Sequence, residues 1–324
     1  MYIVLAMALR RVIGIDAGGT KLLGAVVDEE LVVADRVHRS WRGEDRADLL
    51  ETIVDAVAEV RAAAPDVEAA GFGIPALVDH ARGISELSVH LPLDGVPFQD
   101  FMSERLGLEV HVDNDANAAL LAEHRYGAAR GIADAILLTI GTGVGGALLL
   151  DGRLYRGGSG FAGELGHMVV DIDGPLCSGG CSNRGCLETL VSGPAIARAG
   201  NDAAARAPGS ALAAALLAGR AITGPLVTEL AHGGDAAARA VIEGVGTSLG
   251  AGLSSLVNIF NPELIVIGGG VIGAGDLLLD PARRVVAERA LSPSARAVRI
   301  VAAAFGPEAG VLGAALLAFD GGRS

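Results

Sequence analysis

The chain has 324 residues and a formal net charge of −13; 51% of its residues are hydrophobic, but only 3% are aromatic. Its length fits about two domains, and its negative charge argues against nucleic acid or an anionic membrane as a partner, because both attract a basic face. The sequence contains no uninterrupted apolar run of about 18 residues, so a membrane span is not expected.

The first residues, MYIVLAMALRR, do not fit a secretory signal. Their basic residues follow the apolar run instead of preceding it, and no cleavage site of small residues comes next. We therefore expect a soluble, cytoplasmic protein.

Strands and helices alternate through the first part of the chain. Residues 11–41 predict three strands separated by glycine and acidic turns. Residues 46–65 have helical spacing and end at a proline. Residues 69–79 predict a strand that leads into a loop, and residues 103–131 predict a helix end, a strand, a turn and a second helix.

The second part repeats this layout. Residues 134–158 again give an apolar strand, a glycine turn, an apolar strand and an aspartate, as the N-terminus does. We interpret this as an internal duplication of two domains that each open with a hairpin, with a hinge near Val112–Asp113. Residues 193–258 are mostly alanine-rich helix, residues 261–286 return to strand, triple glycine and helix, and residues 308–319 form a final helix of small residues.

Three glycine turns predict a nucleotide site. In IDAGGTK, the turn can bring backbone N–H groups close to an anion, and Asp16 would face the metal that accompanies phosphates. An ordinary hairpin turn is the simpler alternative. The residues of this turn are Asp16, Gly18, Gly19, Thr20 and Lys21.

The second turn, IGTGVGG, contains G-x-G-x-x-G at Gly141, Gly143 and Gly146. A dinucleotide-binding fingerprint needs a helix directly after the glycines, but a strand follows here, so a hairpin with Thr142 at its tip fits a nucleotide phosphate better. The third turn, Gly268–Gly270, lies between a strand and a helix, where a helix N-terminus also favours an anion.

HVDNDANAALLAEH places Asn114 and Asp115 where a strand ends and a helix begins. Either side chain could be the helix N-cap. The functional interpretation makes Asp115 a general base that accepts a proton from a hydroxyl group.

GELGH places Glu164 three residues before His167, and Glu188 follows the last cysteine by two. Charged acceptors make strong hydrogen bonds, so these side chains suit the binding of sugar hydroxyls. The alternative is that both glutamates lie on solvated faces, where glutamate is usually found.

The three cysteines of the chain follow His167, in the order Cys177, Cys181 and Cys186. Their odd number excludes a fully paired set of disulfides, and their spacing is not that of C-x-x-C redox sites. One histidine and three cysteines form a closed tetrahedral zinc shell of the structural kind. Free structural thiols are the alternative. Zinc would also fix the His167 ring, so that its other nitrogen can meet a ligand.

Together these motifs resemble the ROK family (repressors, open reading frames and kinases) of the actin-like sugar kinase superfamily. The resemblance runs from about Val12 to Ala318 and rests on IDAGGTK, VDNDANAALLAEHRYGAARG, IGTGVGGALLLDGRLYRGGSG, GELGHMVVDIDGP, NRGCLE, NPELIVIGGG and EAGVLGAALLA. It implies an α/β fold of two actin-like (ribonuclease H-like) domains with a ligand cleft between them. Residues 1–112 with the C-terminal helix 308–324 would form the small domain, and residues 113–307, with the zinc loop 167–186, the large one.

The resemblance also assigns roles. It implies ATP and Mg²⁺ as cofactors, together with structural Zn²⁺, and Asp115 as the catalytic base. The sugar-binding residues would be Asn114, Glu164, His167 and Glu188, and the zinc ligands His167, Cys177, Cys181 and Cys186. The residues around the nucleotide would be Asp16, Gly18, Gly19, Thr20, Lys21, Thr142, Gly143 and the glycines Gly268, Gly269 and Gly270.

Three departures from the family pattern bear on specificity. The family usually has C-x-C where this chain has C-SGG-C. It commonly has Gly at the position of Ala76, and it often has Asn at the position of His90. The last two positions lie near the sugar in such enzymes, so His90 is also a candidate substrate-binding residue.

We expect an ATP-dependent hexose kinase that acts on the 6-hydroxyl, with glucose as the first candidate substrate. Kinases of N-acetylglucosamine, N-acetylmannosamine, mannose or fructose are alternatives within the family, and polyphosphate is a less favoured donor. From other classes, a non-catalytic sugar sensor would need neither Asp16 nor Asp115. A sugar-responsive repressor would need a DNA-binding domain ahead of the first strand, which begins near Arg11. Family members are often dimers or tetramers, so a homo-oligomer is expected.

Overall fold

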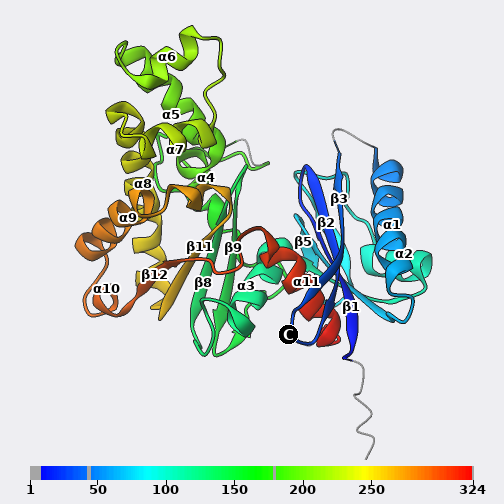
Figure 1. Cartoon of the computed structure of the whole chain (residues 1–324). Coiled ribbons are helices and arrows are strands. Elements are labelled where there is room, and N and C mark those ends of the chain that lie inside the picture. Colours follow the sequence, from blue (N-terminus) through cyan, green and yellow to red (C-terminus); the bar gives the residue numbers. More distant parts are fainter. Residues whose placement is uncertain (1–8, 42–44, 178–179, 323–324) are drawn as a thin grey trace, which may run out of the picture. The chain divides into compact units, whose positions relative to one another are not determined.

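The computed structural model describes residues 9–41, 45–177 and 180–322. The opening stretch MYIVLAMA, which we do not expect to be a signal peptide, lies outside them. The chain forms two compact units (Figure 1). Unit 1 contains the residues up to Glu123, the segment Arg156–Phe161 and the residues from Glu308 on, whereas unit 2 contains His124–Tyr155 and Ala162–Pro307.

Unit 1 is built on a five-stranded sheet with the strand order β3-β2-β1-β4-β7. β1 pairs antiparallel with β2, and β1, β4 and β7 run parallel. The strands are β1 (Arg11–Ala17), β2 (Lys21–Asp28), β3 (Val33–Ser40), β4 (Ala69–Ile74) and β7 (Glu109–Asn114), and a separate small hairpin comprises β5 (Leu77–Asp79) and β6 (Ile84–Leu87).

Helices cover both faces of this sheet (Figure 1). One face packs against α1 and α2 and the other against α11, the last helix of the chain. The helices of unit 1 are α1 (Arg46–Ala63), α2 (Phe98–Leu106), α3 (Asp115–Tyr126), which runs on past Glu123, and α11 (Ala309–Phe319), preceded by the short η3 (Gly306–Glu308).

The two faces differ in side-chain size. Side chains alternate between the faces along a strand, so Ile13 and Ile15 are fully buried in the core with α1, while Gly14 points at α11. A Cβ atom at Gly14 would lie 2.2 Å from the carbonyl oxygen of Val311, and one at Gly71 would lie 1.8 Å from that of Ala314. The glycines thus let α11 approach the backbone of the sheet directly.

Unit 2 repeats the plan. Its five strands have the order β10-β9-β8-β11-β12. When the strands of each sheet are numbered along the chain, both sheets have the spatial order 3-2-1-4-5. This shared order agrees with the predicted duplication. The strands are β8 (Ala135–Ile140), β9 (Val144–Leu150), β10 (Arg153–Leu154), β11 (Leu264–Gly268) and β12 (Arg299–Ala302).

The helical stretch predicted for residues 193–258 forms most of the helical part of unit 2. The helices are η1 (Leu165–His167), α4 (Glu188–Val191), α5 (Gly193–Arg206), α6 (Ala211–Leu217), α7 (Gly224–His232), α8 (Ala236–Phe260), η2 (Gly270–Ala274), α9 (Asp276–Arg289) and α10 (Ser294–Ala297).

Helix α8 is long and apolar enough to cross a membrane by length and composition alone. However, 61% of its most apolar window is buried inside the protein, and it packs against α5, α7 and α9. In the described part of the chain, α8 is therefore a core helix of unit 2.

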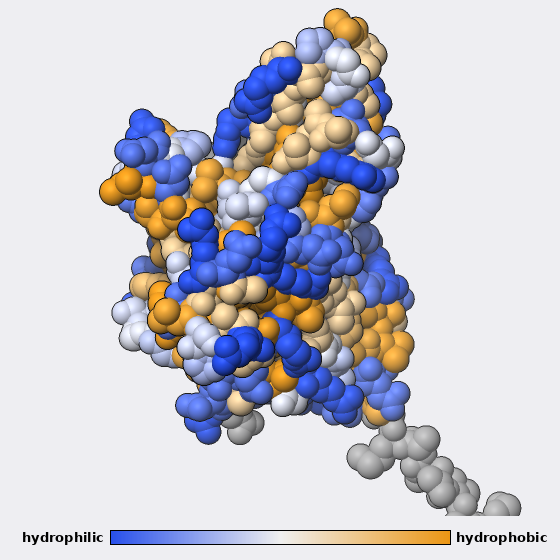
Figure 2. Space-filling model, turned by 90° about the vertical axis from the view of Figure 1, so that its left-hand side faces the viewer, coloured by the Kyte–Doolittle hydropathy of each residue, from blue (hydrophilic) through white to orange (hydrophobic). Residues whose placement is uncertain are grey.

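Figure 2 shows one face of the molecule, on which orange hydrophobic residues are mixed with blue hydrophilic ones.

Unit 1 extends past the hinge expected near Val112–Asp113. β7 pairs with β4 along its whole length, from Glu109 opposite Ala69 to Asn114 opposite Ile74. This pairing keeps β7 and most of α3 in the first unit, and a hinge at Val112–Asp113 would cut through it.

Candidate functional site

Two aspartates of unit 1 lie at the same edge of its sheet. The carboxyl ends of parallel strands meet at one edge, where α/β proteins usually bind ligands. Asp16 lies near the carboxyl end of β1, and Asp115 directly follows β7. The Asp16 carboxylate also reaches the first turn of α11, since a Cβ atom at Gly310 would lie 2.4 Å from its Oδ2.

Both carboxyl groups have raised pKa values. Burial, followed by the negative charge of Asp115, raises the pKa of Asp16 from 3.8 to about 7, although Lys21 partly opposes the shift. Burial also raises the pKa of Asp115, whereas the hydrogen bond from the Ala116 N–H and the charge of the nearby His90 lower it by less. Two close, desolvated carboxyl groups favour either a proton or a metal cation as their neighbour.

His90 lies over the first glycine turn. A Cβ atom at Gly19 would be 2.9 Å from the Cβ of His90, and the imidazole is close enough to Asp115 to lower its pKa. The loop that carries His90 is fixed by Ser88, whose N–H donates to Asp94 and whose hydroxyl donates to the Pro75 carbonyl. The turn and the predicted base therefore share one neighbour, His90.

Asn114 is the N-cap of α3, as one of the two alternatives anticipated. Its Oδ1 accepts from the N–H groups of Ala116 and Asn117, and its Nδ2 donates to the Ala76 carbonyl at 3.3 Å. The two lone pairs of the amide oxygen are thus engaged, and one N–H of Nδ2 remains for a ligand. Ala76, a departure from the family pattern, lies directly beside this side chain.

The two glycine turns of unit 2 come together at one edge of its sheet. β8 and β11 run parallel, and Gly269, with φ +81°, approaches β8 so closely that a Cβ atom there would be 2.4 Å from the Ile140 carbonyl oxygen. The turn between β8 and β9, which carries Thr142 and Gly143, is held by a hydrogen bond of 2.8 Å from the Gly193 N–H to the Gly141 carbonyl.

The helix expected directly after Gly268–Gly270 is not an α-helix. A short 3-10 helix, η2, occupies Gly270–Ala274, and α9 begins only at Asp276. The positive φ of Gly275, +58°, separates the two. No α-helix therefore begins directly at this turn, and anion binding there would depend on the backbone of the turn itself.

Glu188 connects the cysteine segment to the hairpin turn of unit 2. Glu188 is only 7% exposed, so the solvated-face alternative is wrong for it, and its Oε2 accepts from the Val144 N–H at 2.9 Å. The second oxygen, Oε1, is left to accept from a ligand. Glu164 is different, because its side chain is 47% exposed.

The predicted zinc ligands converge. One donor atom from each of His167, Cys177, Cys181 and Cys186 lies within 4.8 Å of the others. The sulfur of Cys177 is 3.5 Å from His167 Nδ1, and the sulfurs of Cys181 and Cys186 are 3.5 Å apart. These separations fit the edges of a zinc tetrahedron, about 3.5–3.8 Å for bonds of about 2.0–2.3 Å. The longer C-SGG-C spacing is thus compatible with convergence, although two of its residues, 178 and 179, lie outside the described chain.

The other ring nitrogen of His167 faces away from the cysteines. His167 Nε2 is 3.9 Å from Glu164 Oε2, which is beyond hydrogen-bond distance, whereas the carboxylate that orients a metal-bound histidine usually accepts a hydrogen bond from this nitrogen. A sugar hydroxyl could take the same position. The cluster therefore fits zinc.

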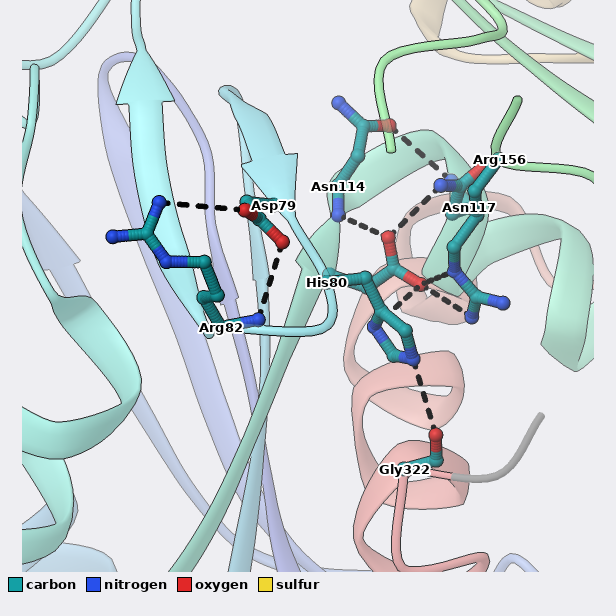
Figure 3. Close-up of polar contacts among 8 residues, drawn as sticks. Asp79, His80, Arg82, Asn114, Asn117, Arg156 and Gly322 are labelled. Carbon is teal, nitrogen blue, oxygen red and sulfur yellow. Dashed lines mark hydrogen bonds and ion pairs between the residues drawn. The ribbon is translucent and has the colours of Figure 1, made fainter. Parts of the chain in front are cut away.

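Sequence reasoning missed a buried network next to Asp115. Asp113, at the end of β7, pairs with Arg156 and approaches His80 (Figure 3). Arg156 is 43 positions away in the sequence, and the motif that contains it, IGTGVGGALLLDGRLYRGGSG, does not indicate its partner. A buried charge within a strand was the one available signal, because such a charge requires a partner.

Comparisons with known proteins agree on one family. The model of the ROK family matches residues 12–320. A glucokinase of Thermotoga maritima is 33% identical over 307 residues, which cover 94% of this chain and 96% of that protein. The crystal structure of a ROK family glucokinase from Streptomyces griseus, in complex with glucose and AMPPNP, superposes with a TM-score of 0.86 at 36% identity and covers 96% of this chain and 99% of that one.

Repressors are also similar. A xylose repressor of Caldicellulosiruptor bescii is 30% identical over 285 residues, which cover 86% of this chain and 70% of the repressor. Both kinases and regulators of this fold are thus related to the chain.

The raised pKa of Asp16 predicts a pH-dependent cost to stability. Between pH 3.8 and about 7 the folded state holds a proton that the unfolded state releases, so the contribution of Asp16 is fully present below pH 3.8 and is lost as the pH rises through about 7. Asp16→Asn stays neutral. Without nucleotide or Mg²⁺, the free energy of unfolding of the variant minus that of the wild type should therefore increase by roughly 2–3 kcal/mol between pH 5 and pH 8.

Denaturant unfolding at both pH values measures this difference. Asp55→Asn, on the exposed side of α1, is the matched control and should show no such gain. An Asp16→Asn advantage that is the same at pH 5 and pH 8 would contradict the assigned burial.

Proposed function

The chain belongs to the ROK family, and on this premise we propose that it is an ATP-dependent hexose kinase that phosphorylates the 6-hydroxyl, with glucose as its main substrate. The observation that carries the proposal is the position of Asp115, a desolvated carboxyl group at a strand end beside a second carboxyl and a glycine turn. The similarity to glucokinases over almost the whole chain supports it.

Asp115 acts as the general base. It accepts the proton of the sugar hydroxyl while the hydroxyl oxygen forms a bond to the γ-phosphorus of ATP, and the bond from that phosphorus to the bridging oxygen breaks to release ADP. Its raised pKa brings the carboxylate closer to the pH at which proton transfer is most efficient. The Ala116 N–H, which donates to Oδ1 at 2.9 Å, holds the carboxylate in place.

Backbone N–H groups and Asp16 would bind the phosphates and their metal ion. The turns at Gly18–Thr20 and Thr142–Gly143 offer backbone N–H groups that can donate to phosphate oxygens, and Lys21 adds a positive charge. Asp16 would hold Mg²⁺, because a desolvated carboxylate next to a second one favours a divalent cation beyond the single charge of Lys21. When bound, Mg²⁺ offsets the charge that develops on the transferred group.

Carboxylates and amides would bind the sugar. Glu188 Oε1, the second N–H of Asn114 and the exposed carboxylate of Glu164 can each take a hydroxyl. His90 and Ala76 flank Asp115 and Asn114, so they would determine which hexose is accepted. Mannose, fructose, N-acetylglucosamine and N-acetylmannosamine therefore remain alternative substrates.

Structural zinc at His167 and the three cysteines would cross-link the segment that leads to Glu188. We further propose a homo-oligomer, a dimer or tetramer, in the cytoplasm, with no nucleic-acid partner. The similarity to xylose repressors makes a regulator the second candidate, but 30% of that repressor lies outside the match, and the acidic charge of this chain does not favour DNA.

Asp115→Asn should abolish catalysis without abolishing binding. The amide keeps the shape of the side chain but cannot accept the hydroxyl proton, so kcat should fall by about 10²–10⁴-fold. Calorimetry should show a Kd for glucose within about threefold of the wild type, since a group that acts in the transition state contributes little to ground-state binding. Substantial remaining turnover would exclude Asp115 as the base.

Metal analysis tests the zinc site. Protein purified without chelators should contain about one zinc per chain. Cys186→Ser should lose the metal, lower Tm and raise KM for ATP, because Cys186 precedes the Glu188 that holds the Val144 N–H. The matched control is Ser182→Ala, an exposed position in the same loop. Wild-type protein with well under one zinc per chain would contradict this assignment.

A further inference from the structure

A buried carboxylate lies immediately before the predicted catalytic corner. The Asp113 side chain is only 2% exposed, and the residue precedes Asn114 and Asp115 at the carboxyl end of β7. A charge at such a depth destabilises the fold unless hydrogen bonds and an opposite charge compensate it. Figure 3 labels the neighbours that surround it, His80, Asn117 and Arg156.

Arg156 supplies the opposite charge. Its Nε and Nη2 donate to Asp113 Oδ2 at 2.9 and 2.7 Å, and its own side chain is only 13% exposed. Two guanidinium nitrogens on one carboxylate fix direction as well as charge.

The other oxygen of Asp113 holds the catalytic corner. Asp113 Oδ1 accepts from the Asn114 N–H at 2.7 Å and from Asn117 Nδ2 at 2.9 Å. Asn114 ends the strand, and Asn117 lies in the first turn of α3. One carboxylate therefore joins the strand end to the helix start, and Asp115 lies in the sequence between the two groups that it holds.

His80 does not replace the arginine. Its Nε2 lies 3.1 Å from the Gly322 carbonyl oxygen, which can only accept, so Nε2 carries the hydrogen in the neutral ring. The other nitrogen, Nδ1, is 4.0 Å from Asp113 Oδ2 and has no hydrogen-bond partner among the described residues. A separation of 4.0 Å is too long for a hydrogen bond, so the charge of Asp113 is compensated by Arg156.

The segment that carries Arg156 is itself docked on unit 1. Arg156–Phe161 belongs to this unit although the residues on both sides of it belong to unit 2. Gly160, with φ +92°, lies so close to β5 that a Cβ atom there would be 2.6 Å from the Val78 carbonyl oxygen. The guanidinium of Arg156 therefore lies on a segment that is itself packed against unit 1.

We infer that Arg156 is a positioning residue for phosphoryl transfer: through its ion pair with Asp113 it fixes the strand end and helix start that orient Asp115. This inference rests on the proposed kinase function, in which Asp115 is the base. In this role Arg156 touches neither substrate and acts on Asp115 through Asp113.

Kinetics of Arg156→Met test the inference, with Arg82→Met as the matched control. Arg82 lies near the same site (Figure 3), but its side chain is 66% exposed and pairs with Asp79 and Glu86. Arg156→Met should lower kcat roughly tenfold to a hundredfold, because small displacements of a catalytic group are that costly. KM for ATP should stay within about twofold, and Arg82→Met should leave both constants within about twofold.

A second pair of variants separates positioning from folding. Asp113→Leu/Arg156→Met removes both charges, so Tm should recover relative to Arg156→Met. The double variant still lacks the acceptor for Asn114 and Asn117, so its kcat should stay low. Arg156→Lys keeps a positive charge and should therefore have a higher kcat than Arg156→Met, but a lower one than the wild type. A double variant with full kcat, or Arg156→Met with wild-type kcat and only a lower Tm, would overturn the inference. A wild-type protein that phosphorylates no sugar would overturn the kinase proposal itself.

Discussion

In unit 1, α11 packs against the sheet, and α3 packs against α11, at glycine positions where any side chain would collide with backbone atoms. Cβ atoms at Gly14 and Gly71 would lie 2.2 and 1.8 Å from carbonyl oxygens of α11, and one at Gly313 would lie 1.7 Å from the Ala118 carbonyl oxygen of α3. This contact brings the first turn of α11 to Asp16 and keeps the start of α3 close to the sheet. The desolvation that raises both carboxyl pKa values follows from this close packing.

In unit 2 a single stretch of chain links the predicted metal cluster to the glycine turn between β8 and β9. Cys186 contributes a sulfur to the cluster, and Glu188, two residues later, holds the Val144 N–H. Gly193, at the start of α5, holds the Gly141 carbonyl. Both ends of the turn that carries Thr142 are therefore fixed by residues 186–193, so a zinc ion at the cluster would also stabilise this turn.

Local patterns were enough to predict the strands, the glycine turns and the convergence of His167 with the three cysteines, because period, turn residues and ligand spacing are properties of neighbouring residues. They could not predict the pairing of Asp113 with Arg156, which joins positions 43 apart. Local patterns also predicted a helix directly after the triple glycine, but Gly270–Ala274 form a short 3-10 helix and α9 begins only afterwards. The role of Asn114 as the N-cap was one of two alternatives that only its hydrogen bonds could decide.

The central claim, that this chain transfers phosphate from ATP to a hexose, is tested most directly by sugar-dependent ADP release. Mg-ATP and wild-type protein would be assayed with glucose, mannose, fructose, N-acetylglucosamine and N-acetylmannosamine. The account predicts the highest kcat/KM with glucose. A preference for an N-acetyl sugar would keep the chemistry and assign the difference to His90 and Ala76, whereas no sugar-dependent ADP release with any of the five would contradict the account.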